Sequence, residues 1–372
     1  MARPQVESIP ERLDAHSDVK GQGVVVAFVD SGFYPHSDLM RPRRRVRAYA
    51  DATRDVPVGT DFFTAQGHSW HGTMTACAAC GNGYASGGVY RGIASEAEVV
   101  LIKARNDAGR IRGNNVAHAI RFPLRYPKLG IRIVNVSLGV DDDDPDAADV
   151  LRAVEEVVKA GITVFAAAGN SPGMLPEAPG SSPYAITVGG QDDRATPLSR
   201  MGGVWPSSHG SRNGVPKPDL LAPAIWLPAP MLPGTITARE AAPLFQLLSI
   251  LEEMSTEHGF SEAHSLSTPD EREGVASVMR ALEGRIGRQK YISPEYQHVD
   301  GTSFASPIAA SVAAQLLEVD PSLGPDEVRE AMVATAALLD DVPRGVQGAG
   351  LLRPRDAVDW VRARLAARNA SR

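Results

Sequence analysis

The feature that most constrains the fold of this chain is an alternation of short apolar runs with longer segments of helical spacing. The apolar runs are rich in β-branched residues and have the character of buried parallel strands. They cover residues 24–29, 99–102, 131–136, 162–167 and 185–188. Residues 115–126 and 146–160 show helical spacing, and Gly161 supplies a stop for the second helix. This alternation predicts an α/β fold with a doubly wound, mostly parallel sheet flanked by helices.

Length and composition define the class of chain. With 372 residues, of which 43% are apolar and 22% charged, the chain is long enough for a full core and is typical of globular proteins. We expect residues 1–372 to form a single domain. The net charge of −6 argues against nucleic acid as the main partner. No run approaches the roughly 18 apolar residues of a membrane span, so a membrane is not an expected partner either.

The amino terminus and the cysteines bear on where the protein works. Residues 1–20 lack the apolar segment of an export signal. The chain has two cysteines, Cys77 and Cys80, too few for a disulfide framework. These features predict a cytoplasmic protein, or a secreted one if the sequence is a mature fragment. The CxxC pair lies among small residues with no nearby ligand pair, which favours packing over metal binding or redox chemistry.

Polar residues directly follow three of the predicted strands. Asp30 ends the first strand, residues 135–139 end a middle strand, and residues 166–170 end the next one. Ligands and catalytic groups gather at the carboxyl ends of the strands in an open parallel sheet. We therefore expect these three segments to deliver polar groups to a common rim.

An acid, a base and a nucleophile stand in contexts that suit acyl transfer. A serine hydroxyl attacks well only when a base removes its proton and a carboxylate orients that base. Asp30 ends a strand, His71 precedes a run of small residues, and Ser303 begins an apolar helical stretch. Free N–H groups at a helix start stabilise negative charge, and the amide of Asn170 offers a second donor. Each residue alone also suits a cap, a turn or an ordinary histidine, but their joint occurrence favours catalysis.

The assembled motifs resemble those of the subtilisin-like serine proteases, also called subtilases or the peptidase S8 family. The similarity rests on Val-Val-Val-Ala-Phe-Val-Asp-Ser-Gly at 24–32, His-Gly-Thr at 71–73 and Gly-Thr-Ser-Phe-Ala-Ser-Pro at 301–307. The order of aspartate, histidine and serine along the chain is also that of the family. The resemblance runs from about residue 7 to residue 357 and is interrupted once.

The resemblance implies roles for individual residues. Asp30, His71 and Ser303 would form the catalytic triad, and Asn170 would contribute to the oxyanion hole. The residues expected to bind the substrate as an added β-strand are Ser137, Leu138 and Gly139, together with Ala168 and Gly169. The resemblance thus implies a serine endopeptidase that acts on extended peptide or protein segments.

The implied chemistry requires no cofactor, and no metal site is predicted. Calcium is frequent in the family, and Glu7 and Asp38 fall near positions that could supply oxygens, but no full ligand set is readable. Two other functions remain open. A peptide ligase or cyclase would pass the same acyl-enzyme to an amine, and a catalytically silent scaffold would bind peptides in the same cleft.

Residues 225–300 form an insertion relative to the resemblance, and their composition is helical. Thr268 to Glu271 combines a capping box with a proline at the first helical position. The predicted apolar faces are Val275, Val278, Leu282 and Ile286 in this helix and Leu244, Leu247, Leu251 and Met254 in a helix upstream. We expect a helical hairpin packed on the body of the protein, in preference to a lid or a docking arm for a peptide or protein.

Overall fold

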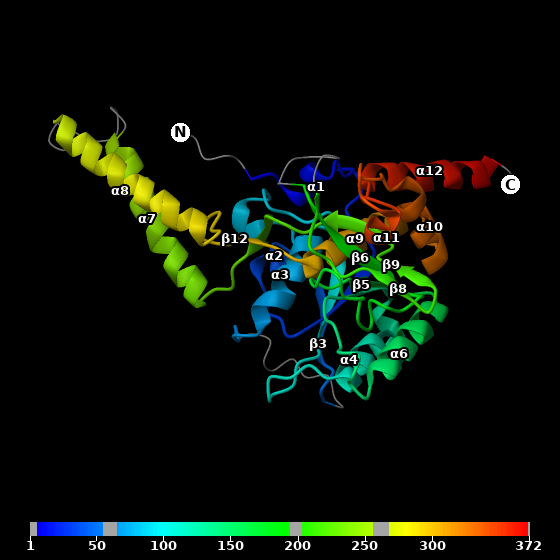
Figure 1. Ribbon diagram of the computed structural model, residues 1–372. Coiled ribbons are helices and arrows are strands. Elements are labelled where there is room, and N and C mark those ends of the chain that lie inside the picture. Colours follow the sequence, from blue (N-terminus) through cyan, green and yellow to red (C-terminus); the bar gives the residue numbers. More distant parts are fainter. Residues whose placement is uncertain (1–5, 55–64, 194–202, 256–267, 371–372) are drawn as a thin grey trace.

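The computed structural model describes residues 6–54, 65–193, 203–255 and 268–370, and a mostly parallel sheet lies at its centre (Figure 1). The strand order is β10-β6-β5-β4-β1-β3-β2, and β7 pairs antiparallel with β6. The strands are β1 (Val25–Asp30), β2 (Val46–Asp51), β3 (Glu98–Lys103), β4 (Ile131–Val136), β5 (Thr163–Ala167), β6 (Ile186–Asp192), β7 (Gly203–Val204) and β10 (Leu220–Pro223). The predicted doubly wound α/β fold is confirmed.

The five apolar runs correspond to β1, β3, β4, β5 and β6 of this sheet. Three strands of the sheet were not predicted, namely the two-residue β7 and the longer β2 and β10. β2 is an edge strand whose Arg47 is exposed, and β10 has four residues and ends at a proline. Neither strand has the long apolar run that marks a strand buried on both faces.

Side chains of β1 alternate between two hydrophobic cores. Val26 and Phe28 belong to the core that contains α3 (Ser69–Cys80) and α9 (Thr302–Val319). The residues of β1 that alternate with these two belong to the second core, on the opposite face of the sheet. The helices α4 (Gly113–Ile120) and α6 (Ala147–Lys159) cover that face. Figure 1 shows α4 and α6 on one side and α9, α10 (Pro325–Thr335) and α12 (Pro354–Ala370) on the other. A sheet covered on both faces explains the apolar character of its inner strands.

The helix expected over residues 115–126 is two helices. α4 ends at Ile120, and α5 (Phe122–Arg125) begins after one intervening residue, with Pro123 in its first turn. Proline is favoured in a first turn and disfavoured in a helix interior, so Pro123 starts a new helix rather than continuing the old one. The helix expected over 146–160 is α6, which ends before Gly161 in its left-handed conformation.

The remaining elements are short and lie outside the main sheet. They are α1 (Ile9–Arg12), α2 (Ser37–Met40), η1 (Tyr84–Ser86), η2 (Pro127–Leu129), α11 (Arg344–Gln347), the pair β8 (Gly210–Arg212) and β9 (Val215–Lys217), and the pair β11 (Leu227–Pro230) and β12 (Tyr296–Val299). In the described part of the chain, no helix is both long and apolar enough to cross a bilayer.

The insertion is a helical hairpin formed by α7 (Ile236–Ser255) and α8 (Pro269–Arg288). The predicted capping box at Thr268 is present. The antiparallel pair of β11 and β12 forms the root of the hairpin, and Phe245, Leu248 and Ile286 join the main core. The two helices pack on each other and extend away from the body (Figure 1). The expectation that the hairpin lies along the body is therefore wrong for most of its length.

The apolar faces predicted for the two helices were only partly correct. On α7 the buried residues are Ala241, Phe245 and Leu248, whereas the predicted Leu247 is exposed. On α8 the predicted Val278 is exposed, and Met279 packs in its place. Helical spacing identifies an apolar face, but α7 carries more than one such face. Which face is buried depends on where the partner helix packs.

Candidate active site

Asp30, His71 and Ser303 meet at one rim of the sheet. The Nδ1 atom of His71 lies 2.8 Å from Oδ1 and 2.9 Å from Oδ2 of Asp30, and its Nε2 atom lies 3.0 Å from Oγ of Ser303. An ionised carboxylate only accepts hydrogen bonds, so Nδ1–H donates to Asp30. The lone pair of Nε2 then faces the serine, whose hydroxyl donates to it. Three segments that are far apart in the sequence thus bring a carboxylate, an imidazole and a hydroxyl into one hydrogen-bonded series.

Asp30 is held rigidly by its surroundings. It ends β1, between β3 and β4, and is fully buried. The backbone N–H of Ser31 donates to its Oδ1 at 2.7 Å, and the hydroxyl of Thr75 donates to its Oδ2 at 3.2 Å. A side chain at Gly72 would come within 2.8 Å of the Asp30 Cβ. The glycine that follows His71 therefore allows α3 to pack directly on the end of β1.

The protonation of His71 reflects two opposing effects. Burial disfavours the imidazolium, but the charge of Asp30 and the hydrogen bond to it outweigh burial. Together they raise the pKa of His71 above its ordinary value of 6.5. The aspartate therefore makes His71 a stronger base while holding its Nε2 atom toward the serine.

Ser303 lies in the first turn of α9, and Pro307 affects that turn. A proline has no N–H, so Pro307 leaves the carbonyl of Ser303 without its helical partner. The hydroxyl of Ser137 donates to this carbonyl at 2.8 Å. The hydroxyl of Ser137 also accepts from the side-chain NH₂ of Asn135 at 2.9 Å. The side-chain oxygen Oδ1 of Asn135 in turn accepts from the hydroxyl of Ser306 at 2.7 Å. This buried network ties the end of β4 to the turn that carries the nucleophile.

Asn170 presents its NH₂ group on the Ser303 side. Its Oδ1 accepts from the backbone N–H of Thr302 at 2.9 Å and from the Thr302 hydroxyl at 3.0 Å, which fixes the orientation of the amide. A Cβ on Gly301 would lie 3.3 Å from the Asn170 Nδ2 and 3.5 Å from the Ser303 Oγ, so both atoms border the same space. The backbone N–H of Ser303 is a second donor at the amino terminus of α9.

The five residues expected to bind substrate line one cavity. Ser137, Leu138 and Gly139 form one wall, and Ala168 and Gly169 form the other. The cavity has a volume of about 230 Å³ and reaches Ser303. We call it the acyl-side pocket because these two segments flank the nucleophile.

Sequence reasoning missed one acidic residue of the acyl-side pocket. Glu177 lines the pocket, and a Cβ on Gly139 would lie 2.9 Å from its carboxylate. Burial and the charges of Asp141 and Asp142 raise the pKa of Glu177 above its ordinary value of 4.5. The backbone of Val140 pairs with Ala178 and brings Glu177 to this place. No motif in the sequence signals this long-range bridge.

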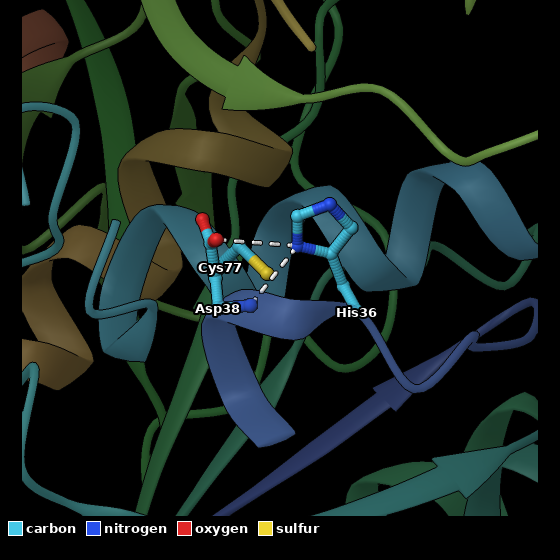
Figure 2. Close-up of side chains that lie close together, drawn as sticks. All are labelled: His36, Asp38 and Cys77. Carbon is cyan, nitrogen blue, oxygen red and sulfur yellow. Dashed lines mark hydrogen bonds and ion pairs between the residues drawn. The ribbon is translucent and has the colours of Figure 1, made fainter. Parts of the chain in front are cut away.

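Cys77 and Cys80 are free and buried in the core, as the packing interpretation predicted. Cys77, however, lies beside His36 and Asp38, with the ligand atoms of all three residues within 4.8 Å of one another (Figure 2). The sequence around the cysteines contains no ligand pair, but the fold brings one next to Cys77, so the expectation that no such pair lies nearby is wrong. His36 and Asp38 precede Cys77 by about forty positions, so only the packing of α2 on α3 unites them.

Two residues of this cluster, His36 and Asp38, make hydrogen bonds to protein groups. His36 caps α2 by accepting the Asp38 N–H at 3.2 Å, and the Asp38 carboxylate accepts from Tyr296 at 2.5 Å and from the Ala85 N–H at 3.0 Å. A nitrogen and a sulfur beside one carboxylate also do not match the all-oxygen ligands of calcium. Among the described residues this is the only group of three histidine, cysteine or acidic side chains with ligand atoms this close, and it includes Asp38 but not Glu7.

A serine, a histidine and a buried aspartate in series on a doubly wound sheet, in the chain order aspartate, histidine, serine, are features of the class of subtilisin-like serine proteases. The chain belongs to the Subtilase family, because the family model (peptidase S8) matches residues 21–350. A solved structure titled "Proteases from Pseudoalteromonas arctica PAMC 21717" has the same fold, with a TM-score of 0.60 and 19% identity over 97% of this chain and 96% of that chain. The family predicted from the three motifs is confirmed.

Curated relatives carry protease names. The chain is 30% identical to serine protease AprX of Bacillus subtilis over 91% of its own length and 66% of that protein. It is also 30% identical to subtilisin-like protease 2 of Pseudogymnoascus destructans, over 60% of this chain and 49% of that protein. The chain therefore spans less than two thirds of either relative. A third relative, 28% identical over 45% of this chain and 20% of its own length, is named minor extracellular protease Vpr of Bacillus subtilis, so the cytoplasmic location stays a prediction.

Proposed function

We propose that this chain is a serine endopeptidase that cuts extended peptide or protein segments through an acyl-enzyme on Ser303. The observation that carries the proposal is the hydrogen-bonded series from Asp30 through His71 to Ser303. His71 accepts the hydroxyl proton at Nε2 while Oγ forms a bond to the carbonyl carbon of the substrate. Asp30 orients the ring and stabilises the imidazolium that forms.

The carbonyl oxygen becomes an oxyanion in this step and needs donors. We assign the Nδ2–H of Asn170 and the backbone N–H of Ser303 to this role. The first group lies near the same point as the Ser303 Oγ, and the second belongs to the first turn of α9, where N–H groups have no partner within the helix. His71 then gives its proton to the amine nitrogen as the C–N bond breaks. Water attacks the remaining ester, His71 takes the proton of that water, and the proton returns to Ser303 as the acid product leaves.

The walls of the acyl-side pocket support an extended substrate. Residues 137–139 continue from β4, and Ala168 and Gly169 follow β5, so each wall prolongs a strand of the sheet. A substrate segment paired with these walls would present its backbone as an added strand. This mode of binding selects an unfolded or extended segment. The proposed chemistry itself uses only protein groups and water.

The test is covalent labelling with a fluorophosphonate probe, which reacts with an activated serine. We expect labelling of the parent protein and none of Ser303→Ala. Ser311→Ala is the control that still labels, because Ser311 lies further along α9 and bonds within the helix. Mass spectrometry of a cleaved peptide should show hydrolysed products. Ligated or cyclic products would instead indicate transfer to an amine, and a parent protein that never labels would indicate a silent peptide-binding scaffold.

A further inference from the structure

A second cavity is lined by Trp70 and Met74, which lie on either side of His71 in the sequence of α3. Its volume is about 530 Å³, and it shares no lining residue with the acyl-side pocket. Trp70 and Met74 of α3 and Leu232 and Ile236 of the hairpin root are its apolar walls. The Trp70 ring stands edge-on to the His71 ring at 5.3 Å, and Met74 follows His71 by one helical turn. The cavity therefore lies next to the proposed base.

The direction of the proposed reaction assigns this cavity to one half of the substrate. His71 gives its proton to the departing amine, so the chain downstream of the cut bond leaves past the imidazole. The acyl half occupies the opposite side of Ser303, where the acyl-side pocket lies. The cavity beside Trp70 and Met74 is thus positioned for the first residues downstream of the cut, and we call it the leaving-side cavity.

An exposed apolar face of α7 continues from the leaving-side cavity. One face of the helix carries Ile236, Pro243, Leu247, Ile250 and the half-buried Met254. The charged residues Arg239 and Glu240 lie between the first two of them. Ile236, Leu247 and Ile250 are 68%, 43% and 43% exposed, whereas Ala241, Phe245 and Leu248 are buried on the opposite face. We call the exposed face the α7 apolar stripe.

Ile236 belongs to both features, so the leaving-side cavity and the α7 apolar stripe form one surface. The surface starts beside Trp70 and continues along α7, and this helix extends away from the body (Figure 1). From Ile236 to Met254 the helix rises about 27 Å, at roughly 1.5 Å per residue. An extended chain would cover this length with about eight residues.

We propose that the leaving-side cavity and the α7 apolar stripe bind an apolar segment of the substrate downstream of the cut bond. The proposal rests on the proposed function, because only proteolysis gives the substrate a downstream half. Continuity with the catalytic rim identifies the occupant: a chain that leaves past His71 meets Ile236 first and then the rest of the stripe. Contiguous exposed apolar groups of this kind mark binding surfaces more often than isolated ones do.

The test compares two peptides that share the same residues up to the cut bond. The short peptide ends two residues after the cut, and the long peptide continues with about ten residues rich in Leu and Phe. The variant is Leu247→Gln combined with Ile250→Gln, because glutamine keeps the helix propensity of α7. Val333→Gln on α10 removes an exposed apolar side chain far from the hairpin and serves as the matched control.

We expect the parent to cleave the long peptide with a lower KM than the short one. The double variant should raise the KM for the long peptide about tenfold, the loss that fits two apolar contacts, and should leave the short peptide unchanged. Equal KM values for both peptides in the parent, or equal changes for both in the double variant, would overturn the proposal. Probe labelling of Ser303 in every variant separates this failure from a failure of the proposed function.

Sedimentation of the parent and the double variant tests another occupant. We expect both proteins to have the same oligomeric state. A dimer of the parent that the double variant abolishes would overturn the proposal and would assign the α7 apolar stripe to contacts between copies of this chain.

Discussion

The pair of Asp30 and His71 determines how the proposed activity depends on pH. The imidazolium cannot accept the Ser303 proton, so kcat/KM should rise with pH as His71 loses its proton. Because Asp30 raises the pKa of His71, the midpoint of this rise should lie above pH 6.5. Asp30→Asn removes the charge, so it should lower the midpoint and reduce kcat by about 10⁴-fold.

The measurement is a pH profile of kcat/KM for a short peptide in the parent and in Asp30→Asn. The same profile in Asp14→Asn is the control, because Asp14 pairs with Arg355 on the surface. A midpoint that stays in place when Asp30 loses its charge would contradict the assignment of the rise to His71.

At the scale of residues, local motifs predicted which side chains lie close together, and their catalytic roles stay a prediction. Asp30, His71, Ser303 and Asn170 each stand in such a motif, and the structure brings all four to one rim. Glu177 stands in no motif, and it reaches the pocket through a bridge between distant loops. Contacts of this kind depend on the packed fold and leave no local pattern.

At the scale of elements, the end of β4 supports the first turn of α9. Ser137→Ala would remove the donor to the Ser303 carbonyl, which Pro307 already deprives of a helical partner. An unsatisfied buried carbonyl costs about 1–3 kcal/mol, so we expect a Tm lower by several degrees. We also expect kcat to fall about tenfold with a smaller change in KM, because the turn that carries the nucleophile loses its support.

Thermal melts and steady-state kinetics on a short peptide would measure both effects. Ser311→Ala is the matched control, since Ser311 is also buried in α9 but donates to the Ile308 carbonyl within the helix. It should lower Tm without a selective loss of kcat. Equal effects of the two variants on kcat would show that Ser137 only stabilises the fold.

The elements themselves were predictable to different degrees. Strands buried on both faces can be predicted because they are apolar runs. The edge strand β2 and the short β10 lack such a run, so the sequence does not indicate them. The helix boundary at Pro123 depends on whether the proline ends one helix or begins another. The buried face of α7 depends on the position of α8, which spacing along one helix cannot specify.

At the scale of the whole molecule, we propose that residues 1–372 form one peptidase domain and that the hairpin within 225–300 is an appendage to it. Phe245, Leu248 and Ile286 join the core near the root, while the outer part extends away from the body. Replacing residues 250–281 with a short Gly/Ser turn keeps these contacts. We expect Tm to change by less than about 4 °C, the shift of roughly 1 kcal/mol in a large domain.

Calorimetry of the shortened protein would test this expectation, and probe labelling of Ser303 would report an intact site. A fall in Tm well beyond this range, with loss of labelling, would show that the outer hairpin is part of the folding unit. The matched control is Phe245→Ala, which removes a root contact and should lower Tm more than the truncation does, by the several kcal/mol typical of a buried aromatic.

If the proposed reaction is correct, the amide of Asn170 has a consequence for the energy of its oxyanion step. Its oxygen is bound by Thr302 at the start of α9, so its nitrogen is aimed before any substrate arrives. Water around a newly formed charge would have to reorient, but this dipole is already in place when the tetrahedral intermediate forms. Water dipoles would have to reorient around the oxyanion in every catalytic cycle. The Asn170 dipole is oriented once, when the chain folds.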